Sequence, residues 1–379
     1  MQLIKIAKPN DISSYLKSLD LDSGGVKIIS QKSDLLFFRI NNLKTPAINI
    51  LKQDALSVGA DVASPSGVIT CAKDRFDCLL IGTKRQLFRL SQKELAQPFG
   101  LKDVAKKLQE HLSAKRFPLK IMGVLNINND SFYSGSRFVG EDAIKAIEQM
   151  ISDGADIIDI GAVSSRPGSD AVSEDEELGR LKDIFSVIKS NKLYEKVILS
   201  IDSYSPLVVK EALNSGFKII NDITGARDDR LIKLAIEYQA KLVIMHMQGT
   251  PKTMQQNPTY ECVVSEVDEF FTNQINKCEE LGLNKENIIL DVGIGFGKTL
   301  NHNLELLRAH EHFCHHRCEV LIGASRKSMI DMIIPTPTEQ RLPGTLMIHT
   351  KAVERGASIV RCHDVKEHIQ AFRVFDSIN

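Results

Sequence analysis

From residue 119 onward, short apolar runs rich in β-branched residues alternate with polar or glycine-rich turns and helical stretches. Near-continuous apolar runs are typical of parallel strands that are covered on both faces. Between them, Ser205 and Pro206 indicate an N-cap followed by Pro at the first helical position, and Ser173 with Glu176 indicates a capping box. The apolar runs are LKIMGVL (119–125), DIIDIGA (156–162), KVILSID (196–202), KIINDI (218–223), KLVIMH (241–246), NIILDVG (287–293), EVLIGAS (319–325) and SIVRCHD (358–364).

The number of these units predicts the fold class. Eight strand-and-helix units within residues 118–379 predict a (β/α)8 TIM barrel, an α/β fold. An open, doubly wound sheet is the alternative. Eight comparable units without an interruption favour closure into a barrel.

Residues 1–117 break this rhythm. FFRI (37–40) and CLLI (78–81) predict strands, and the patterns near 46–57 and 101–114 predict helices. The lysines in the second of these helices indicate a solvated face. We therefore expect a smaller N-terminal α/β domain before the barrel. It carries no recognisable chemical motif, so its role stays open.

Composition narrows the class of protein. The chain has 379 residues with 48 basic and 48 acidic side chains. Because the net charge is zero, we expect no sequence-independent binding to nucleic acid. No apolar run approaches the length of a membrane span, and the N-terminus lacks the layout of a signal peptide. Seven scattered cysteines favour reduced thiols. These features predict a cytoplasmic enzyme that acts on small molecules, without nucleic-acid or membrane partners.

Polar residues end nearly every predicted strand, where TIM barrels form their active sites. Carboxylate and amide groups suit a flat heterocycle with adjacent N–H donors; here they are Asp202, Asn221 and Asp291. Positively charged and N–H-donating groups suit phosphate; here they are Arg166, Lys327, Arg361 and His363. Strand alternation puts Arg361 and His363 on one side, where they can grip one anion, and leaves Cys362 for packing. The pattern predicts a heterocycle pocket beside a phosphate pocket.

The glycine-rich stretch DVGIGFGKT (291–299) is not a phosphate loop. A P-loop would need Gly where Val292 stands, and a dinucleotide fingerprint would need Gly where Lys298 stands. We interpret the glycines as a tight turn that keeps side chains away from a ligand at Asp291. Lys298 is expected to be an exposed turn residue without a role.

The ordered set of motifs resembles the dihydropteroate synthase family, which joins a pterin to p-aminobenzoate. The resemblance covers residues 118–379. It rests on MGVLNINNDSF (122–132), SSRPGS (164–169), SIDS (200–203), INDI (220–223), MHMQGTP (245–251), D-x-G-x-G-F-G-K (291–298), SRKS (325–328) and R-x-H-D-V (361–365).

The resemblance implies a reaction and a set of site residues. An arylamine, p-aminobenzoate, attacks the methylene of 6-hydroxymethyl-7,8-dihydropterin pyrophosphate, giving 7,8-dihydropteroate and pyrophosphate. The implied pterin-binding residues are Asp202, Asn221, Met245, Asp291 and Lys327. The implied p-aminobenzoate and loop residues are Phe132, Ser165, Arg166, Pro167 and Phe296. The implied pyrophosphate residues are Asn126, Arg166, Arg361 and His363, with Asn126 also contacting Mg²⁺. The implied catalytic residues are Asn126, Asp130, Lys327, Arg361 and His363.

The resemblance also implies two lid loops, near 126–139 and 162–172, and a homodimer is expected. The family's usual Thr-Pro in the first loop is Asn128-Asn129 here, its frequent Glu is Val163, and its usual Thr is Ser165. These departures affect loop geometry and the arylamine pocket, including sensitivity to sulfonamides. Oligomeric state and metal preference do not follow from the sequence alone.

Three alternatives stay open. A pterin-binding methyltransferase domain shares the barrel and the pterin set but does not need Arg361 and His363. A catalytically inactive barrel would serve as a binding module, which an intact ring of polar strand ends argues against. A zinc site is the third, because metal-ligand residues gather before the seventh strand: His310, His312, Cys314, His315, His316 and Cys318.

Overall fold

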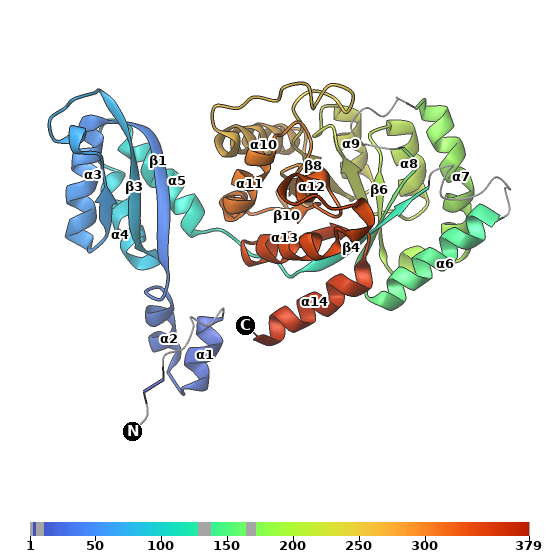
Figure 1. The fold of residues 1–379 in the computed structure, drawn as a ribbon, viewed down its shortest axis with the longest axis horizontal. Helices are drawn as coiled ribbons and strands as arrows, with labels where there is room; N and C mark the ends of the chain where they lie inside the picture. Colours follow the sequence, from blue (N-terminus) through green and yellow to red (C-terminus); the bar gives the residue numbers. More distant parts are fainter. Residues whose placement is uncertain (1–2, 5–10, 128–137, 164–171, 379) are drawn as a thin grey trace. The chain divides into compact units, whose positions relative to one another are not determined.

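The computed structural model describes residues 3–4, 11–127, 138–163 and 172–378. The chain divides into two compact units, residues 1–114 and 115–377 (Figure 1). The division lies close to the boundary expected after residue 117. Each unit has its own apolar core, so each is described separately.

The N-terminal unit is a three-stranded antiparallel sheet in the order β1-β3-β2, packed against helices. Its core joins the sheet to α3, α4 and α5. The predicted strands at 37–40 and 78–81 and the two predicted helices are confirmed. The elements are α1 (Ile12–Ser18), α2 (Ser23–Ser30), β1 (Leu35–Lys44), α3 (Thr45–Val58), β2 (Asp61–Ala63), η1 (Ser66–Val68), β3 (Arg75–Thr83), α4 (Lys84–Glu94) and α5 (Leu101–Leu112).

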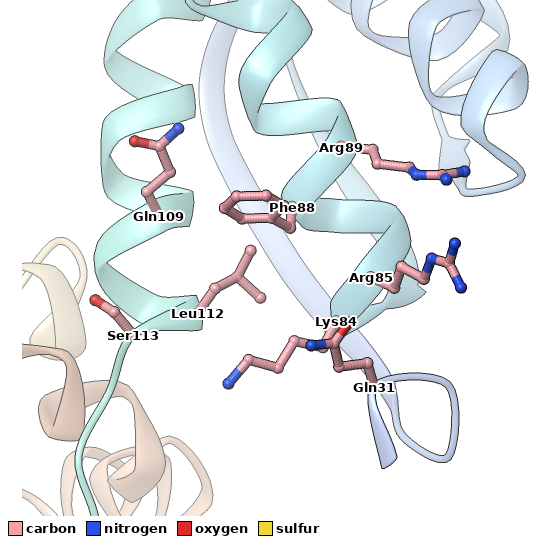
Figure 2. Close-up of a pocket in the computed structure, with 8 residues that line it drawn as sticks. All are labelled: Gln31, Lys84, Arg85, Phe88, Arg89, Gln109, Leu112 and Ser113. Carbon is pink, nitrogen blue, oxygen red and sulfur yellow. The ribbon is translucent and has the colours of Figure 1, made fainter. Parts of the chain in front are cut away.

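A pocket of about 480 Å³ lies within this unit, beside α4 and α5 (Figure 2). Phe88 of α4 points toward α5, where Leu112 lies opposite it. Lys84, Arg85 and Arg89 line the same pocket. The residues that line the pocket include three basic side chains and no acidic one, so positive charge dominates the lining.

The second unit is a closed barrel of eight parallel strands, and the open-sheet alternative is wrong. Every apolar run predicted from the sequence overlaps one strand. The strands are β4 (Lys120–Asn126), β5 (Ile157–Gly161), β6 (Ile198–Asp202), β7 (Ile219–Asp222), β8 (Lys241–Met245), β9 (Ile288–Asp291), β10 (Glu319–Ile322) and β11 (Ile359–Cys362). They follow one another around the barrel in chain order, with β11 closing against β4.

Helices surround the barrel (Figure 1). The Ser205 hydroxyl accepts from Val208 N at 3.3 Å with Pro206 at the first helical position, as predicted. The Ser173 side chain caps α7, whereas Glu176 pairs with Arg180 instead of completing the capping box. The helices are α6 (Phe138–Asp153), α7 (Glu174–Ser190), α8 (Pro206–Asn214), α9 (Asp229–Glu237), α10 (Val263–Glu280), α11 (Leu300–Arg308), α12 (Ser328–Ile333), α13 (Leu342–Glu354) and α14 (Val365–Ile378), with short 3-10 segments η2 (Leu193–Glu195), η3 (Lys285–Asn287), η4 (His310–His316) and η5 (Thr338–Gln340).

The barrel interior is layered. One buried layer is apolar and comes from seven strands: Met122, Ile157, Ile219, Val243, Ile289, Leu321 and Ile359. Side chains two residues further along a strand point to the same face. The next inward positions are therefore polar on four strands: Asp159, Asn221, Asp291 and Arg361. The period-two pattern places this polar layer directly above an apolar floor, toward the carboxyl ends of the strands.

Among the described residues, no helix is long and apolar enough to cross a membrane.

Candidate active site

Four polar side chains from four strands form one connected network inside the barrel. Arg361 Nε donates to Asp159 Oδ2 at 2.6 Å, and Arg361 Nη2 donates to Asp202 Oδ2 at 2.6 Å. Asn221 Nδ2 donates to the same Asp159 oxygen at 2.8 Å. The fully buried Asp159 thus joins the predicted residues Asn221 and Arg361, and Arg361 in turn holds the predicted residue Asp202. The sequence interpretation missed Asp159; a charged residue within an otherwise apolar run was the available signal.

This network holds two carboxylates against one guanidinium. Burial opposes the charge on Arg361, but Asp159 and Asp202 raise its pKa above the ordinary value. Burial raises the pKa of Asp202 to about 7, and Arg361 offsets that rise only in part. Because one cation cannot neutralise two carboxylates, the cluster favours binding of a proton or of a donor-rich ligand. Within the described residues Arg361 Nη1 has no hydrogen bond, so one face of the guanidinium is available to a ligand.

Asp291 and Lys327 lie next to this network. Asp291 Oδ1 accepts from Gly293 N at 2.8 Å at the end of β9. Burial raises the pKa of Asp291, while the nearby Lys327 lowers it. Burial lowers the pKa of Lys327 to about 8, and Asp291 opposes that shift. The Lys327 ammonium also bonds to the Ile294 carbonyl and sits 4.4 Å from the Phe296 ring centroid.

The glycine-rich turn after β9 is tight because another loop passes close to it. Gly293 and Gly297 have φ of +66° and +61°. A Cβ on Gly293 would lie 2.0 Å from the His246 carbonyl oxygen, and one on Gly297 would lie 2.7 Å from that of Gln248. The turn therefore needs glycine, as predicted, but the crowding comes from the loop after β8.

Lys298 is buried, so the expectation of an exposed turn residue is wrong. Its ammonium donates to the carbonyl oxygens of Phe296 and His246 at 2.9 and 3.1 Å, and lies 3.0 Å from His246 Nδ1. Burial lowers the pKa of Lys298 to about 7 and that of His246 to about 3. Lys298 thus ties together the loops that follow β8 and β9.

An apolar wall stands beside these polar groups. Met245 and Met247 cluster with Ile223 and Met254, and Phe296 packs against them. The predicted site residues Met245 and Phe296 therefore share one surface. Thioether and aromatic side chains of this kind suit the face of a planar ring.

Arg361 and His363 have different partners. Arg361 contacts Asp159 and Asp202. His363 Nδ1 lies 2.9 Å from Ser325 Oγ, and the backbone N–H of His363 donates to the same oxygen at 3.3 Å. Cys362 is fully buried, as expected for a packing residue. His363 is exposed at the end of β11 and belongs to the rim of the site.

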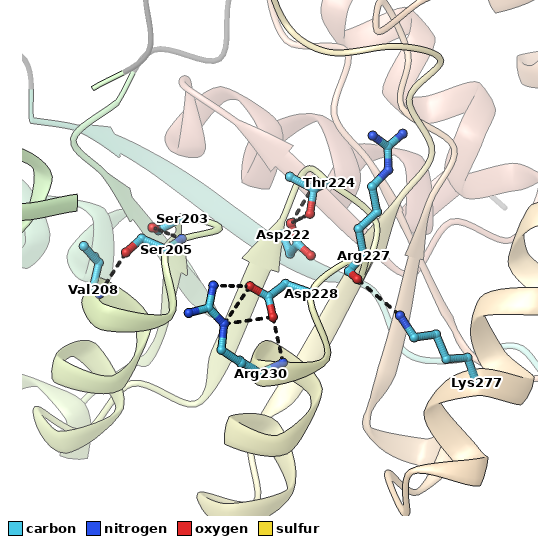
Figure 3. Close-up of polar contacts among 9 residues, drawn as sticks. All are labelled: Ser203, Ser205, Val208, Asp222, Thr224, Arg227, Asp228, Arg230 and Lys277. Carbon is cyan, nitrogen blue, oxygen red and sulfur yellow. Dashed lines mark hydrogen bonds and ion pairs between the residues drawn. The ribbon is translucent and has the colours of Figure 1, made fainter. Parts of the chain in front are cut away.

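Asn221 and Asp222, neighbours at the end of β7, make different contacts, and Figure 3 shows those of Asp222. Asp222 Oδ1 accepts from the Thr224 N–H and hydroxyl at 2.7 and 2.6 Å, and its Oδ2 accepts from Ala226 N at 2.8 Å. Lys277 reaches the same loop through the Ala226 carbonyl. Asp222 therefore shapes the turn, while Asn221 faces the barrel interior and Asp159.

Several predicted residues lie on the two loops that the structure does not describe. Asn126 is described, and its side chain is exposed at the end of β4. The residues outside the described part of the chain are Asp130, Phe132, Ser165, Arg166 and Pro167, together with Asn128 and Asn129.

The cysteines of the histidine-rich segment, residues 310–318, do not form the zinc site that the sequence left open as an alternative. Cys314 Sγ lies 3.7 Å from the Gly356 carbonyl, and Cys318 Sγ lies 3.7 Å from that of Lys285. Neither belongs to a group of potential metal ligands among the described residues.

The strand ends thus combine a buried acceptor set, cations and an apolar wall, an arrangement that can hold a flat heterocycle and stabilise a departing anion. Residues 122–363 match the pterin-binding enzyme family. The chain is 39% identical over 377 residues to the bifunctional dihydropteroate synthase/dihydropteroate reductase of Helicobacter pylori, covering 99% of each chain. The chain belongs to the dihydropteroate synthase family of pterin-binding enzymes.

Solved dihydropteroate synthases share the barrel. The Yersinia pestis enzyme, solved as a sulfonamide drug complex, is 36% identical with a TM-score of 0.63, over 69% of this chain and 94% of that one. The Xanthomonas albilineans dihydropteroate synthase, solved with 4-aminobenzoic acid, is 32% identical with a TM-score of 0.62, over 69% of this chain and 93% of that one. Both coverages correspond to a barrel without the N-terminal unit.

Proposed function

We propose that the polar layer of the barrel catalyses the dihydropteroate synthase reaction. The enzyme condenses 6-hydroxymethyl-7,8-dihydropterin pyrophosphate with p-aminobenzoate and releases pyrophosphate. The observation that carries this assignment is the hydrogen-bonded set of Asp159, Asp202, Asn221 and Arg361 inside the barrel, beside Asp291 and Lys327. Desolvating so many ionisable groups costs free energy, which catalysis explains and binding alone does not.

The pterin binds through its hydrogen-bonding edge. Asp291 and Asp202 accept from the amino-pyrimidine N–H groups, and Asn221 completes the set with an amide. Lys327 donates to the pterin carbonyl side. Met245 and Phe296 cover the ring face, and Phe296 also borders the p-aminobenzoate pocket. The buried acceptors select against a heterocycle that lacks the matching donors, because unmatched buried groups cost about 1–3 kcal/mol each.

Catalysis stabilises charge that develops as the C–O bond breaks. Negative charge grows on the departing pyrophosphate, and positive charge grows on the pterin methylene that the arylamine attacks. Arg361 Nη1 would donate to the anion, and the exposed His363, Arg166 and Asn126 would support it. Asp130 is proposed to stabilise the cationic pterin. Preorganised groups of this kind supply the largest single part of many enzymatic accelerations.

Magnesium is the proposed metal. Asn126 offers an exposed amide oxygen at the end of β4, and hard cations prefer oxygen ligands. Asn126 would hold Mg²⁺ together with phosphate oxygens of the substrate. When bound, the ion neutralises charge on the pyrophosphate.

The direct test uses the full chain with both substrates. Mass spectrometry should detect 7,8-dihydropteroate, and the product should form only when p-aminobenzoate and the pterin pyrophosphate are both present. A methyltransferase domain or an inactive barrel would bind the pterin but form no dihydropteroate.

A reductase activity is the second candidate, because the match to the bifunctional relative extends over the N-terminal unit. Reduction of dihydropteroate adds a hydride and a proton to its pterin ring, and it needs a reduced nicotinamide or flavin as donor. The pocket lined by Lys84, Arg85, Arg89 and Phe88 offers cations for a phosphate and an aromatic ring for stacking. Dihydropteroate-dependent oxidation of such a donor by the full chain supports this activity, and its absence with every donor removes it.

We also propose that the protein is cytoplasmic and forms a homodimer. All seven cysteines are free thiols, which agrees with the reducing cytoplasm. Three consecutive exposed apolar residues lie at and just after the end of α12, namely Met332, Ile333 and Ile334, and Met347 is exposed on α13. Exposed apolar side chains of this kind suit a homodimer interface. Light scattering of the wild-type chain and of Met347→Lys tests this, since the substitution should favour the monomer.

A further inference from the structure

Three imidazoles of η4 surround one carboxylate of α10, in the helical layer outside the barrel strands. The Nε2 atoms of His316, His312 and His315 lie 2.9, 3.3 and 3.5 Å from Asp268 Oδ1. The donor atoms of Asp268, His315 and His316 all lie within 4.8 Å of one another. The synthase reaction uses none of these residues.

Two of these separations, those of His312 and His315, fit a shared cation, whereas His316 at 2.9 Å is at hydrogen-bond distance and would move slightly outward to join the same ion. Zinc bonds of about 2.0–2.2 Å in a tetrahedron separate neighbouring ligand atoms by about 3.3–3.6 Å. The His315 separation from Asp268 Oδ1 is 3.5 Å, which exceeds the usual N–H···O range of about 2.7–3.2 Å. His315 therefore faces the carboxylate at a distance suited to co-ligands rather than to a direct hydrogen bond.

The second nitrogen of His315 fixes the orientation of the ring. His315 Nδ1 lies 2.7 Å from the His312 carbonyl oxygen, and a carbonyl can only accept, so Nδ1 carries the hydrogen. In the neutral ring, Nε2 then presents its lone pair toward an acceptor oxygen of Asp268. A lone pair and a carboxylate oxygen at this distance can act together as ligands of one metal ion. An Nδ1–H bond to a backbone carbonyl is also the usual support of a metal-bound imidazole.

The surroundings give the cluster a rigid and largely apolar shell. His316 packs edge-on against Phe271 with ring centroids 6.1 Å apart, and His312 packs edge-on against Phe313 at 5.4 Å. The side chains of His316 and His315 are 6% and 10% exposed, whereas Asp268 is 21% exposed. Two imidazoles are therefore held in place while the carboxylate side stays open to solvent.

We propose that Asp268, His315 and His316 form a binding site for a divalent transition metal ion, with zinc as the ion that best suits two imidazoles and one carboxylate. Water or the adjacent His312 supplies the fourth ligand. The ion fastens η4 to α10 on the outside of the barrel. It is separate from the magnesium proposed at Asn126, and it uses none of the cysteines of the histidine-rich segment.

The test measures zinc binding by the full chain, prepared without a histidine tag and stripped with a chelator. Calorimetric titration with ZnCl₂ should give one tight site per chain. His315→Gln and Asp268→Asn should each weaken this site at least about tenfold, as expected when a ligand is lost. His302→Gln, a histidine on α11 outside the cluster, is the matched control and should bind zinc like the wild type. No tight zinc site, or unchanged affinity in both variants, would overturn the proposal.

X-ray absorption of the zinc-loaded wild type keeps the test independent of how the variants fold. The proposal predicts a shell of nitrogen and oxygen near 2.0–2.2 Å, about the usual zinc distances, with the scattering of two imidazoles. A sulfur shell near 2.3 Å, about the zinc–thiolate distance, or a shell without imidazole would place the ion elsewhere and refute the assignment.

Discussion

The guanidinium of Arg361, on β11, donates to the carboxylate of Asp202, on β6, at 2.6 Å across the interior of the barrel. The sequence interpretation put Arg361 with the phosphate and Asp202 with the pterin. The contact joins the two residues into one electrostatic unit, with Asp159 as the second carboxylate on the same guanidinium. In the proposed reaction, binding of the pyrophosphate would therefore be coupled to binding of the heterocycle.

Asp159→Asn should lower kcat/KM for the pterin pyrophosphate. The substitution removes one of the two charges that orient Arg361, and unbalancing a buried ion pair costs about 3–5 kcal/mol. Because Asp202 still holds Arg361, we expect a smaller loss, on the order of ten- to a hundredfold in kcat/KM, or about 1.4–2.7 kcal/mol. Steady-state kinetics measure it, with the exposed Asp183→Asn of α7 as control. Equal activity in the two variants would show that Asp159 does not position Arg361.

Pterin affinity should rise with pH up to about 7 and level off above it. The pKa of Asp202 is raised to about 7 by burial, so this carboxyl is protonated below that pH and accepts hydrogen bonds poorly. One titrating group changes affinity by at most about tenfold per pH unit. Calorimetric measurement of the pterin dissociation constant from pH 5 to 9, about two pH units on either side of this pKa, checks the prediction. Asp202→Asn should bind more weakly and flatten the profile; an unchanged slope in that variant would assign the titration to another group.

Lys298→Met should loosen the loop that carries Asp291 and Phe296. Methionine fills similar space but leaves the buried carbonyls of His246 and Phe296 without their donor, at about 1–3 kcal/mol each. We expect a lower melting temperature and a higher KM for the pterin substrate, with a smaller effect on kcat. The exposed Lys233→Met of α9 serves as the control. A variant with wild-type melting and wild-type KM would mean that the buried ammonium has no positioning role.

A chain of residues 115–379 should keep measurable synthase activity. Every described residue of the site lies in the barrel unit, which has its own core. Solved relatives of barrel length cover about the same part of the chain, 69% of it. The expected losses are in solubility and thermal stability. A folded barrel that binds the pterin without releasing pyrophosphate would instead give the N-terminal unit a part in catalysis.

Local patterns were sufficient to predict the barrel, because each strand lies in a mostly apolar run such as that from Ile288 to Leu290. They also placed Asp202, Asn221 and Asp291 at the carboxyl ends of strands, where the structure has them. Asp159 was missed because it lies inside an apolar run, and its partners come from β7 and β11, far away in the sequence.

Tertiary contacts explain the remaining differences. Lys298 follows a glycine-rich stretch that looks exposed, but the loop after β8 supplies a carbonyl that buries it. The imidazoles of the histidine-rich segment could be recognised in the sequence. Asp268, which contacts them, lies on α10 about 45 residues earlier, and local spacing rules do not connect residues that far apart.

Pyrophosphate release by the full chain is the most direct test of the central assignment, which is that the inward polar layer of this barrel performs the synthase reaction. With 6-hydroxymethyl-7,8-dihydropterin pyrophosphate and p-aminobenzoate, wild-type protein should release one pyrophosphate for each dihydropteroate formed. Asp291→Asn should lose most of this activity together with pterin affinity, because an amide offers one acceptor where the carboxylate offers two. The exposed Asp183→Asn should retain it. Release of pyrophosphate at the wild-type rate by Asp291→Asn, or no dihydropteroate from the folded wild type, would contradict the assignment.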